Sequence, residues 1–215
     1  MNQGNTEKIA ALILAAGFSS RMGSFKPLLP LGNTTVIERV VTTFRRAGIK
    51  DVKVVTGHRA GEMRKVLDIL PVDVIENGNY AGGMFSSVQA GVKAIEPGID
   101  AFFLLPADIP LIQSHTISQI YEAYQKHRAK VVYPCFDGQR GHPPLISASY
   151  IESILSWSGE GGLRALMQGW EPESMDLEVN DRWIIMDMDT PEDYHRIRES
   201  YGKTIYQRNR NACPC

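Results

Sequence analysis

The feature that most constrains the fold is an alternation of short apolar runs with segments that have the hydrophobic period of a helix. Helix-period segments separate the runs, and the first of them opens with a threonine cap and closes at Gly48. Unbroken apolar runs are typical of strands that are buried on both faces. The alternation therefore predicts an α/β fold with a parallel sheet and right-handed crossovers. The predicted strands lie at 8–16, 52–57, 72–76, 101–107 and 130–134.

The alternation changes near residue 134. The turn-rich segment CFDGQRGHPPLI predicts a hairpin. Two short helices, a strand near 174–179 and a last helix after Asp189-Thr190-Pro191 are expected to follow it. No linker or internal repeat divides the chain, and 215 residues are enough for one sizeable core. We expect one domain over residues 1–203 and a flexible tail over 204–215.

The composition excludes several classes of protein. The 23 Lys and Arg residues nearly balance the 24 Asp and Glu residues, so the whole chain does not attract nucleic acid or anionic lipid. The longest apolar run, residues 9–16, is too short to cross a bilayer and lacks the features of a signal peptide. Three cysteines, of which two lie in Cys213-Pro214-Cys215, make neither a disulfide framework nor a zinc site. We expect a cytoplasmic protein that binds neither nucleic acid nor membrane.

A glycine loop follows the first apolar run. Gly17 and Gly23 flank a segment that contains Arg21, and Lys26 comes shortly after it. Glycines let backbone N–H groups approach an anion and the two cations add positive charge, so we predict a phosphate site. The loop is not a Walker A motif, because five residues separate its glycines and no Gly-Lys-Ser/Thr follows. A Gly-x-Gly-x-x-Gly motif is also absent, which disfavours a nicotinamide-dependent oxidoreductase.

Two acidic segments complete the candidate site. Asp108 follows a buried strand, where a carboxylate can cap a turn or hold a hard cation. Asp187 and Asp189 lie at alternate positions, so in extended backbone they share one face before the last helix begins. Ligands of open α/β sheets bind beyond the carboxyl ends of the strands. We therefore predict a nucleotide site in which a divalent metal bridges carboxylates and phosphates.

Seven motifs in one order carry a resemblance to a known family. LAAGFSSRMGSFKPLLPLG resembles the signature loop of nucleotidyltransferases with a glycosyltransferase-A-like fold. The similarity covers nearly all of residues 8–200. Within these nucleotidyltransferases, the motifs resemble those of the molybdopterin nucleotidyltransferases. It implies a single-domain, Rossmann-like three-layer fold with a mostly parallel central sheet and a hairpin insertion on the acceptor side. The other motifs are VTGHRAGEM, ENGNYAGGMFSSVQAGV, LLPADIPLI, GQRGHPPLIS, GGLRALM and MDMDTPEDY.

The resemblance implies transfer of a cytidylyl group from CTP to the terminal phosphate of the molybdopterin cofactor, with release of pyrophosphate. Mg²⁺ is the implied metal and Mn²⁺ its alternative, and a molybdoenzyme or its maturation chaperone is a candidate partner. Other readings stay open: GTP in place of CTP, a sugar phosphate or another phosphorylated alcohol as acceptor, or a protein that carries the finished cofactor without turnover. No general base is required, because a phosphate monoester is largely ionised at neutral pH.

Residue roles follow from the resemblance by matching position. Arg21 and Lys26 are expected at the phosphates, and Asp108 at the metal, with Asp189 as the preferred second ligand and Asp187 next in rank. The expected nucleotide-binding residues are Leu14, Ala15, Ala16, Gly17, Ser19, Ser20, Gly23, Thr56, Gly82, Gly83, Ser86 and Ser87. The expected acceptor-binding residues are Arg140, Gly141, His142, Pro143, Gly162 and Arg164.

The choice of base is expected to depend on Ala16. The segment Leu14-Ala15-Ala16-Gly17 is similar to the LAAG of cytidylyltransferases, whereas guanylyltransferases have LAGG. A methyl group at position 16 would narrow the floor of the base pocket and favour a pyrimidine. His58 is expected to have a structural role, such as capping the helix that follows it, and the alternative is that it lines the nucleotide pocket.

Overall fold

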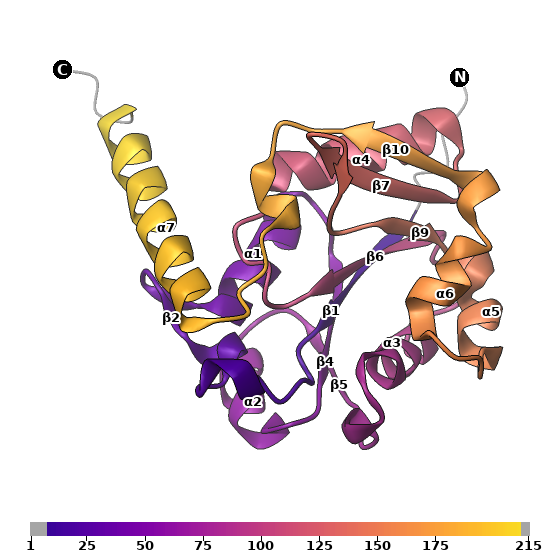
Figure 1. The fold of residues 1–215 in the computed structure, drawn as a ribbon, viewed down its shortest axis with the longest axis horizontal. Helices are drawn as coiled ribbons and strands as arrows, with labels where there is room; N and C mark the ends of the chain where they lie inside the picture. The colour runs from indigo at the N-terminus through magenta and orange to yellow at the C-terminus, as the bar shows by residue number, and fades with distance from the viewer. Residues whose placement is uncertain (1–7, 212–215) are drawn as a thin grey trace.

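The computed structural model describes residues 8–211, with side chains described as far as Lys203. Its central layer is one mixed sheet in the order β10-β7-β9-β6-β1-β4-β5, with β8 paired to β7 (Figure 1). Strands β1, β4, β5 and β6 run parallel, as do β7 and β10, whereas β8 and β9 pair antiparallel. The strands are β1 (Ile9–Leu14), β4 (Asp51–Thr56), β5 (Asp73–Glu76), β6 (Ala101–Pro106), β7 (Val131–Phe136), β8 (Gln139–Arg140), β9 (Leu145–Ser147) and β10 (Ser174–Glu178).

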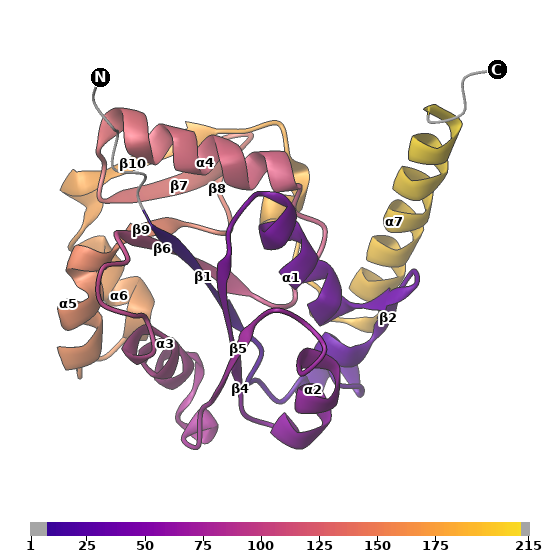
Figure 2. The same ribbon diagram turned by 180° about the vertical axis from the view of Figure 1, so that it is seen from behind.

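Helices cover both faces of the sheet and give the three layers that the sequence predicts (Figures 1 and 2). Each face has its own hydrophobic cluster, to which the helices on that side contribute. The first face carries α1 (Val36–Arg46), α2 (Ala60–Leu67) and α4 (Ser114–His127). The second face carries α3 (Met84–Lys93), α5 (Ile151–Ser156) and α6 (Gly162–Gln168). The predicted α/β fold is confirmed.

Strand β1 lies at the middle of the sheet, between β4 and β6. All six of its residues are buried, and alternate side chains enter the two clusters. Helix α3 packs so closely on it that a Cβ at Gly91 would lie 2.4 Å from Cδ1 of Leu12. The loop that follows β1 therefore leaves the sheet at its centre, at the carboxyl ends of the parallel strands.

The predicted threonine cap of α1 is present as a capping box. Thr35 Oγ1 accepts the backbone N–H of Glu38, and the Glu38 carboxylate accepts the backbone N–H of Thr35. Gly48 follows the helix with a φ of 88°, a conformation that favours glycine. A short hairpin of β2 (Pro30–Leu31) and β3 (Thr34–Thr35) leads into the helix.

Helix α7 (Pro191–Asn211) ends the described chain. Its first turns pack on the β2–β3 hairpin, where Ile197 joins a cluster with Leu31 and the Tyr194 hydroxyl donates to the Pro30 carbonyl at 2.6 Å. The helix continues to Asn211, into the segment 204–215 that the sequence predicts as a flexible tail, because no Gly or Pro interrupts residues 203–211. Cys213-Pro214-Cys215 lies outside the described residues. No helix within the described range is long and apolar enough to span a membrane.

Candidate functional site

Two adjoining cavities lie where β1 and β6 end. The first, of about 280 Å³, is lined by Ala16, Gly17 and several residues between 80 and 87. The second, of about 380 Å³, is lined by residues that include Arg21, His142, Asp187 and Asp189. Both are also lined by the same five residues: Ser19, Lys26, Met84, Pro106 and Asp108. The site thus has two compartments that meet at one lysine and one carboxylate.

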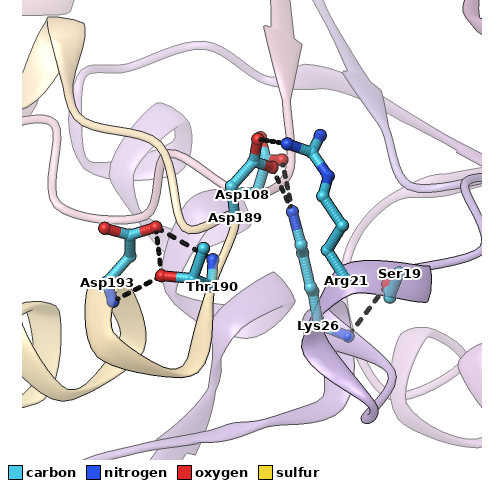
Figure 3. A network of polar contacts seen from close by, with 7 residues as sticks. All are labelled: Ser19, Arg21, Lys26, Asp108, Asp189, Thr190 and Asp193. Atoms are coloured by element: carbon cyan, nitrogen blue, oxygen red, sulfur yellow. Dashed lines mark hydrogen bonds and ion pairs between the residues drawn. The ribbon is translucent and has the colours of Figure 1, made fainter.

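The glycine loop is folded back on itself by a left-handed turn at Ser19. This serine has a φ of 55°, which is uncommon for a residue with a side chain. The strain accompanies a specific contact, since Ser19 Oγ accepts the backbone N–H of Lys26 at 3.1 Å (Figure 3). The loop therefore fixes the backbone of Lys26, from which the side chain extends. That side chain is only 11% exposed. Its ammonium group points toward Asp108 and Asp189 (Figure 3), and Lys26 lines both cavities.

Lys26 joins two carboxylates from distant parts of the chain. Its Nζ lies 3.2 Å from Asp108 Oδ2 and 2.6 Å from Asp189 Oδ1, and Nη1 of Arg21 lies 2.7 Å from Asp189 Oδ2 (Figure 3). Asp108 follows the end of β6, and Asp189 precedes α7, whose start is capped by reciprocal hydrogen bonds between Thr190 and Asp193. Two cations and two anions thus form one partly buried, electrically balanced cluster.

This cluster suits a hard divalent cation. Because Asp108 and Asp189 both contact one ammonium group, their oxygens already converge on a single cationic centre. Asp187 adds a nearby carboxyl, whose pKa is raised by burial and further by the negative charges of Asp189 and Asp108. Among residues 8–203, no three His, Cys, Asp or Glu side chains form a complete metal site. Phosphate oxygens and water would therefore have to complete the coordination of Mg²⁺ or Mn²⁺.

The loop after β5 is organised by Asn77, to which sequence reasoning assigned no role. Its buried amide donates to Ser86 Oγ at 2.9 Å and to Ser87 Oγ at 3.0 Å, and its carbonyl oxygen accepts the N–H of Asn79. These bonds fix the start of α3, which follows Gly83 at a φ of 91°. Asn77 lies directly after a strand, where the strand-end rule places ligand-site residues, but no individual role was predicted for it.

The predicted nucleotide-binding residues divide into two groups. Seven line the cavities: Leu14, Ala16, Gly17, Ser19, Ser20, Gly83 and Ser87. Five line neither cavity: Ala15, Gly23, Thr56, Gly82 and Ser86. Thr56 is buried and its hydroxyl donates to the Ile75 carbonyl at 3.4 Å, so it supports the sheet. Phe18, Tyr80 and Met84 also line the first cavity; all three lie in motifs that carry the resemblance, but none was among the expected nucleotide-binding residues.

Two of the predicted acceptor-binding residues after β7, Arg140 and His142, have different surroundings. His142 lines the second cavity, and burial lowers the pKa of its imidazole. Its Nδ1 is buried and has no hydrogen-bond partner within the described part of the chain. Arg140 lines neither cavity and is held by Glu171 and Asp176, both at 2.6 Å, which raise its pKa. The geometry therefore favours His142 over Arg140 as a contact for a second substrate.

The remaining acceptor predictions have different surroundings. A Cβ at Gly141 would lie 2.5 Å from the Ile184 carbonyl oxygen, so only glycine fits there. Pro143 is buried directly after His142. Gly162 and Arg164 lie in the first turn of α6 and line neither cavity, and Gly162 faces Phe85 of α3. An acceptor contact at these positions stays a prediction.

His58 packs within a group of aromatic rings beside the first cavity. Its ring centroid lies 5.1 Å from that of Phe18, 5.9 Å from that of Phe25 and 6.2 Å from that of Tyr80. Its backbone N–H donates to the Ala16 carbonyl at 3.1 Å. His58 thus supports the wall of the cavity and does not line it.

Comparison with known proteins finds a family model and relatives that match most of this chain. A family model described as the MobA-like NTP transferase domain matches residues 11–176. The molybdenum cofactor cytidylyltransferase of Escherichia coli K12 is 29% identical, over 90% of this chain and 97% of that protein. The nicotine blue oxidoreductase of Paenarthrobacter nicotinovorans is 27% identical, over 88% and 96%. The solved structure of a nucleotidyl transferase from Methanothermobacter thermautotroptrophicus superposes with a TM-score of 0.79 at 27% identity, over 92% of this chain and 99% of that one.

Proposed function

This chain belongs to the MobA-like NTP transferase family and is a nucleotidyltransferase, and on that basis we propose that it transfers a cytidylyl group from CTP to the terminal phosphate of the molybdopterin cofactor. The observation that carries the proposal is the junction of two cavities at Lys26 and Asp108. A transfer between two phosphate-bearing substrates needs such a shared centre, with one compartment for the nucleotide and another for the acceptor.

Charge is the main obstacle to this reaction, because an anionic acceptor phosphate must approach an anionic triphosphate. In this proposal the first cavity takes the base of the nucleotide, and its phosphates extend across the junction with the second cavity. The backbone N–H groups of the glycine loop, Lys26 at the junction and Arg21 in the second cavity bind these phosphates. Asp108 and Asp189 would hold the divalent metal, with Asp187 beside them, and the metal would neutralise phosphate charge. Lys26 and Arg21 would then exchange their carboxylate partners for phosphate oxygens.

The base compartment supports the choice of a pyrimidine. Ala16 lines the first cavity and is 4% exposed. Its methyl group packs tightly, since a Cβ at Gly57 would lie only 2.9 Å from it. In this proposal the methyl forms the floor of the compartment, where a glycine would leave room for a purine. The E. coli relative is also named a cytidylyltransferase.

The molybdopterin cofactor is proposed as the acceptor because the E. coli relative is named for it. In this chain the second cavity would receive it, with His142 as the contact for its polar groups. A carrier protein without turnover would not need Lys26 and two carboxylates at the boundary with a nucleotide compartment. The relative named an oxidoreductase raises hydride transfer as a second candidate, but this chain lacks the dinucleotide-binding motif.

Pyrophosphate release with Mg²⁺ tests the proposal. We expect release with CTP and molybdenum-loaded molybdopterin, and little with GTP, ATP or UTP or with a sugar phosphate as acceptor. Ala16→Gly should raise the rate with GTP relative to CTP by about tenfold, the effect of about 1.4 kcal/mol. The proposal would be overturned if pyrophosphate were released only with another nucleotide or only with another acceptor. It would also be overturned if the protein catalysed nicotinamide-dependent hydride transfer and released no pyrophosphate. No gain in GTP use by Ala16→Gly would refute the role of the methyl group.

A further inference from the structure

Exposed apolar side chains gather at the first cavity. Three large hydrophobic side chains are exposed within residues 8–203: Phe18 at 53%, Met84 at 67% and Ile69 at 77%. Phe18 and Met84 both line the first cavity, whereas Ile69 lies after α2 and lines neither cavity. Apolar side chains that stay exposed at a concave site indicate a surface that a ligand covers.

The ring of Phe18 is held in place although it is exposed. Its centroid lies 5.1 Å from that of His58 and 5.4 Å from that of Tyr80, which it meets edge to face. Tyr80 can pack there because residue 57 is a glycine. A Cβ at Gly57 would lie only 2.6 Å from the Cβ of Tyr80 and would clash with it. Neighbouring rings therefore restrict Phe18 before any ligand binds, which reduces the entropy that binding would cost.

We infer that Phe18 is a stacking surface for the base of the bound nucleotide, with Met84 as a second apolar contact; this inference rests on the proposed function. A base presents a planar π-face, which stacks well on an aromatic ring, and a thioether adapts to its edge. Phe18 lines only the first cavity, whereas Met84 lines both. The ring of Phe18 therefore serves the nucleotide and not the acceptor.

Stacking gives Phe18 a role different from that of Ala16. Every base has a π-face, so Phe18 should contribute affinity for all four nucleoside triphosphates, while Ala16 restricts the size of the base. Phe18 should have no effect on the binding of a polyphosphate that carries no base, because the side chains of Arg21 and Lys26 are expected to bind the phosphates.

Calorimetric titration without acceptor tests this inference. CTP and inorganic tripolyphosphate, each with Mg²⁺, are titrated into the wild type, Phe18→Ala, Phe18→Leu, Phe18→Tyr and the control Ile69→Ala. We expect Phe18→Ala to weaken CTP binding about tenfold and to leave tripolyphosphate binding unchanged. Phe18→Leu should recover only part of the loss, since it restores apolar area without a π-face. Phe18→Tyr and Ile69→Ala should bind both ligands like the wild type.

Three results would overturn the stacking role. These are unchanged CTP binding by Phe18→Ala, an equal loss of tripolyphosphate binding, or full recovery by Phe18→Leu. An equal loss would mean that Phe18 shapes the phosphate loop. A wild type that binds tripolyphosphate but no nucleoside triphosphate would refute the proposed function itself, and so would differ from a failure confined to Phe18.

Discussion

At the scale of the residue, the ammonium group of Lys26 can pair with carboxylates or with phosphate, but not with both at once. Its ammonium group occupies the position between Asp108 and Asp189 that a divalent cation would take, and the same group is expected to bind phosphate. In the protein without nucleotide, we therefore expect Lys26 to compete with a divalent metal for the two carboxylates. Metal and nucleotide would bind better together than apart, because the phosphates offer the displaced ammonium a new partner.

Replacement of Lys26 by methionine tests this competition. We expect Lys26→Met to bind free Mn²⁺ at least about tenfold more tightly than the wild type, since an adjacent positive charge is removed. The same variant should transfer nucleotide much more slowly. Calorimetry without nucleotide measures the affinity, and Lys65→Met, at an exposed lysine of α2, is the control. Unchanged or weaker Mn²⁺ binding by Lys26→Met would rule out the competition.

At the scale of the element, the hairpin of β7 and β8 positions His142. The backbone N–H of His142 donates to the Ile184 carbonyl at 2.8 Å, and Gly141 packs against the same carbonyl. We expect Gly141→Ala to push the hairpin away from residues 182–185 and to raise the KM for the acceptor several-fold, with little change in nucleotide affinity. Steady-state kinetics with each substrate varied in turn measures this. Gly138→Ala, at the exposed tip of the same hairpin, is the control. It shows whether a general loss of stability changes the KM for the acceptor. An equal rise in the KM for CTP would contradict the assignment of the second cavity.

The elements were more predictable from the sequence than the contacts between them. Strand β1 and the capping box of α1 depend on neighbouring residues, so local patterns were sufficient to find them. Arg140 was expected to face a ligand, but its carboxylate partners lie 31 and 36 positions away. Lys26 and Asp189 are 163 positions apart, and they entered one predicted site through the rule that ligands bind beyond parallel strands and through the family resemblance. Their direct ion pair could not be foreseen.

At the scale of the whole molecule, surface carboxylates link stability to pH. Hydrogen bonds from Arg140 lower the pKa of Glu171, and those from Lys130 and Tyr150 lower the pKa of Glu173. A carboxyl group whose pKa is lower in the folded state stabilises the fold above its unfolded pKa, about 4.5, and loses that contribution as the pH falls through the folded value. These pairs tie residues 171–173, directly before β10, to Lys130, Arg140 and Tyr150.

Urea unfolding at pH 7 and at pH 3 checks this linkage. We expect the free energy of unfolding to fall on acidification, and to fall less in the double variant Glu171→Gln/Glu173→Gln, because its neutral side chains have no proton to gain. The contribution is small, since both carboxylates are well exposed. An acid loss of the same size in the double variant would show that other groups dominate.

The central claim is that Asp108, at the junction of the two cavities, takes part in nucleotidyl transfer. The most direct test is the rate of pyrophosphate release from CTP, with Mg²⁺ and molybdenum-loaded molybdopterin, for the wild type, Asp108→Asn and the exposed control Asp68→Asn. The account predicts a loss of about 10²- to 10³-fold in Asp108→Asn and none in Asp68→Asn. A rate in Asp108→Asn within a few-fold of the wild type would contradict it.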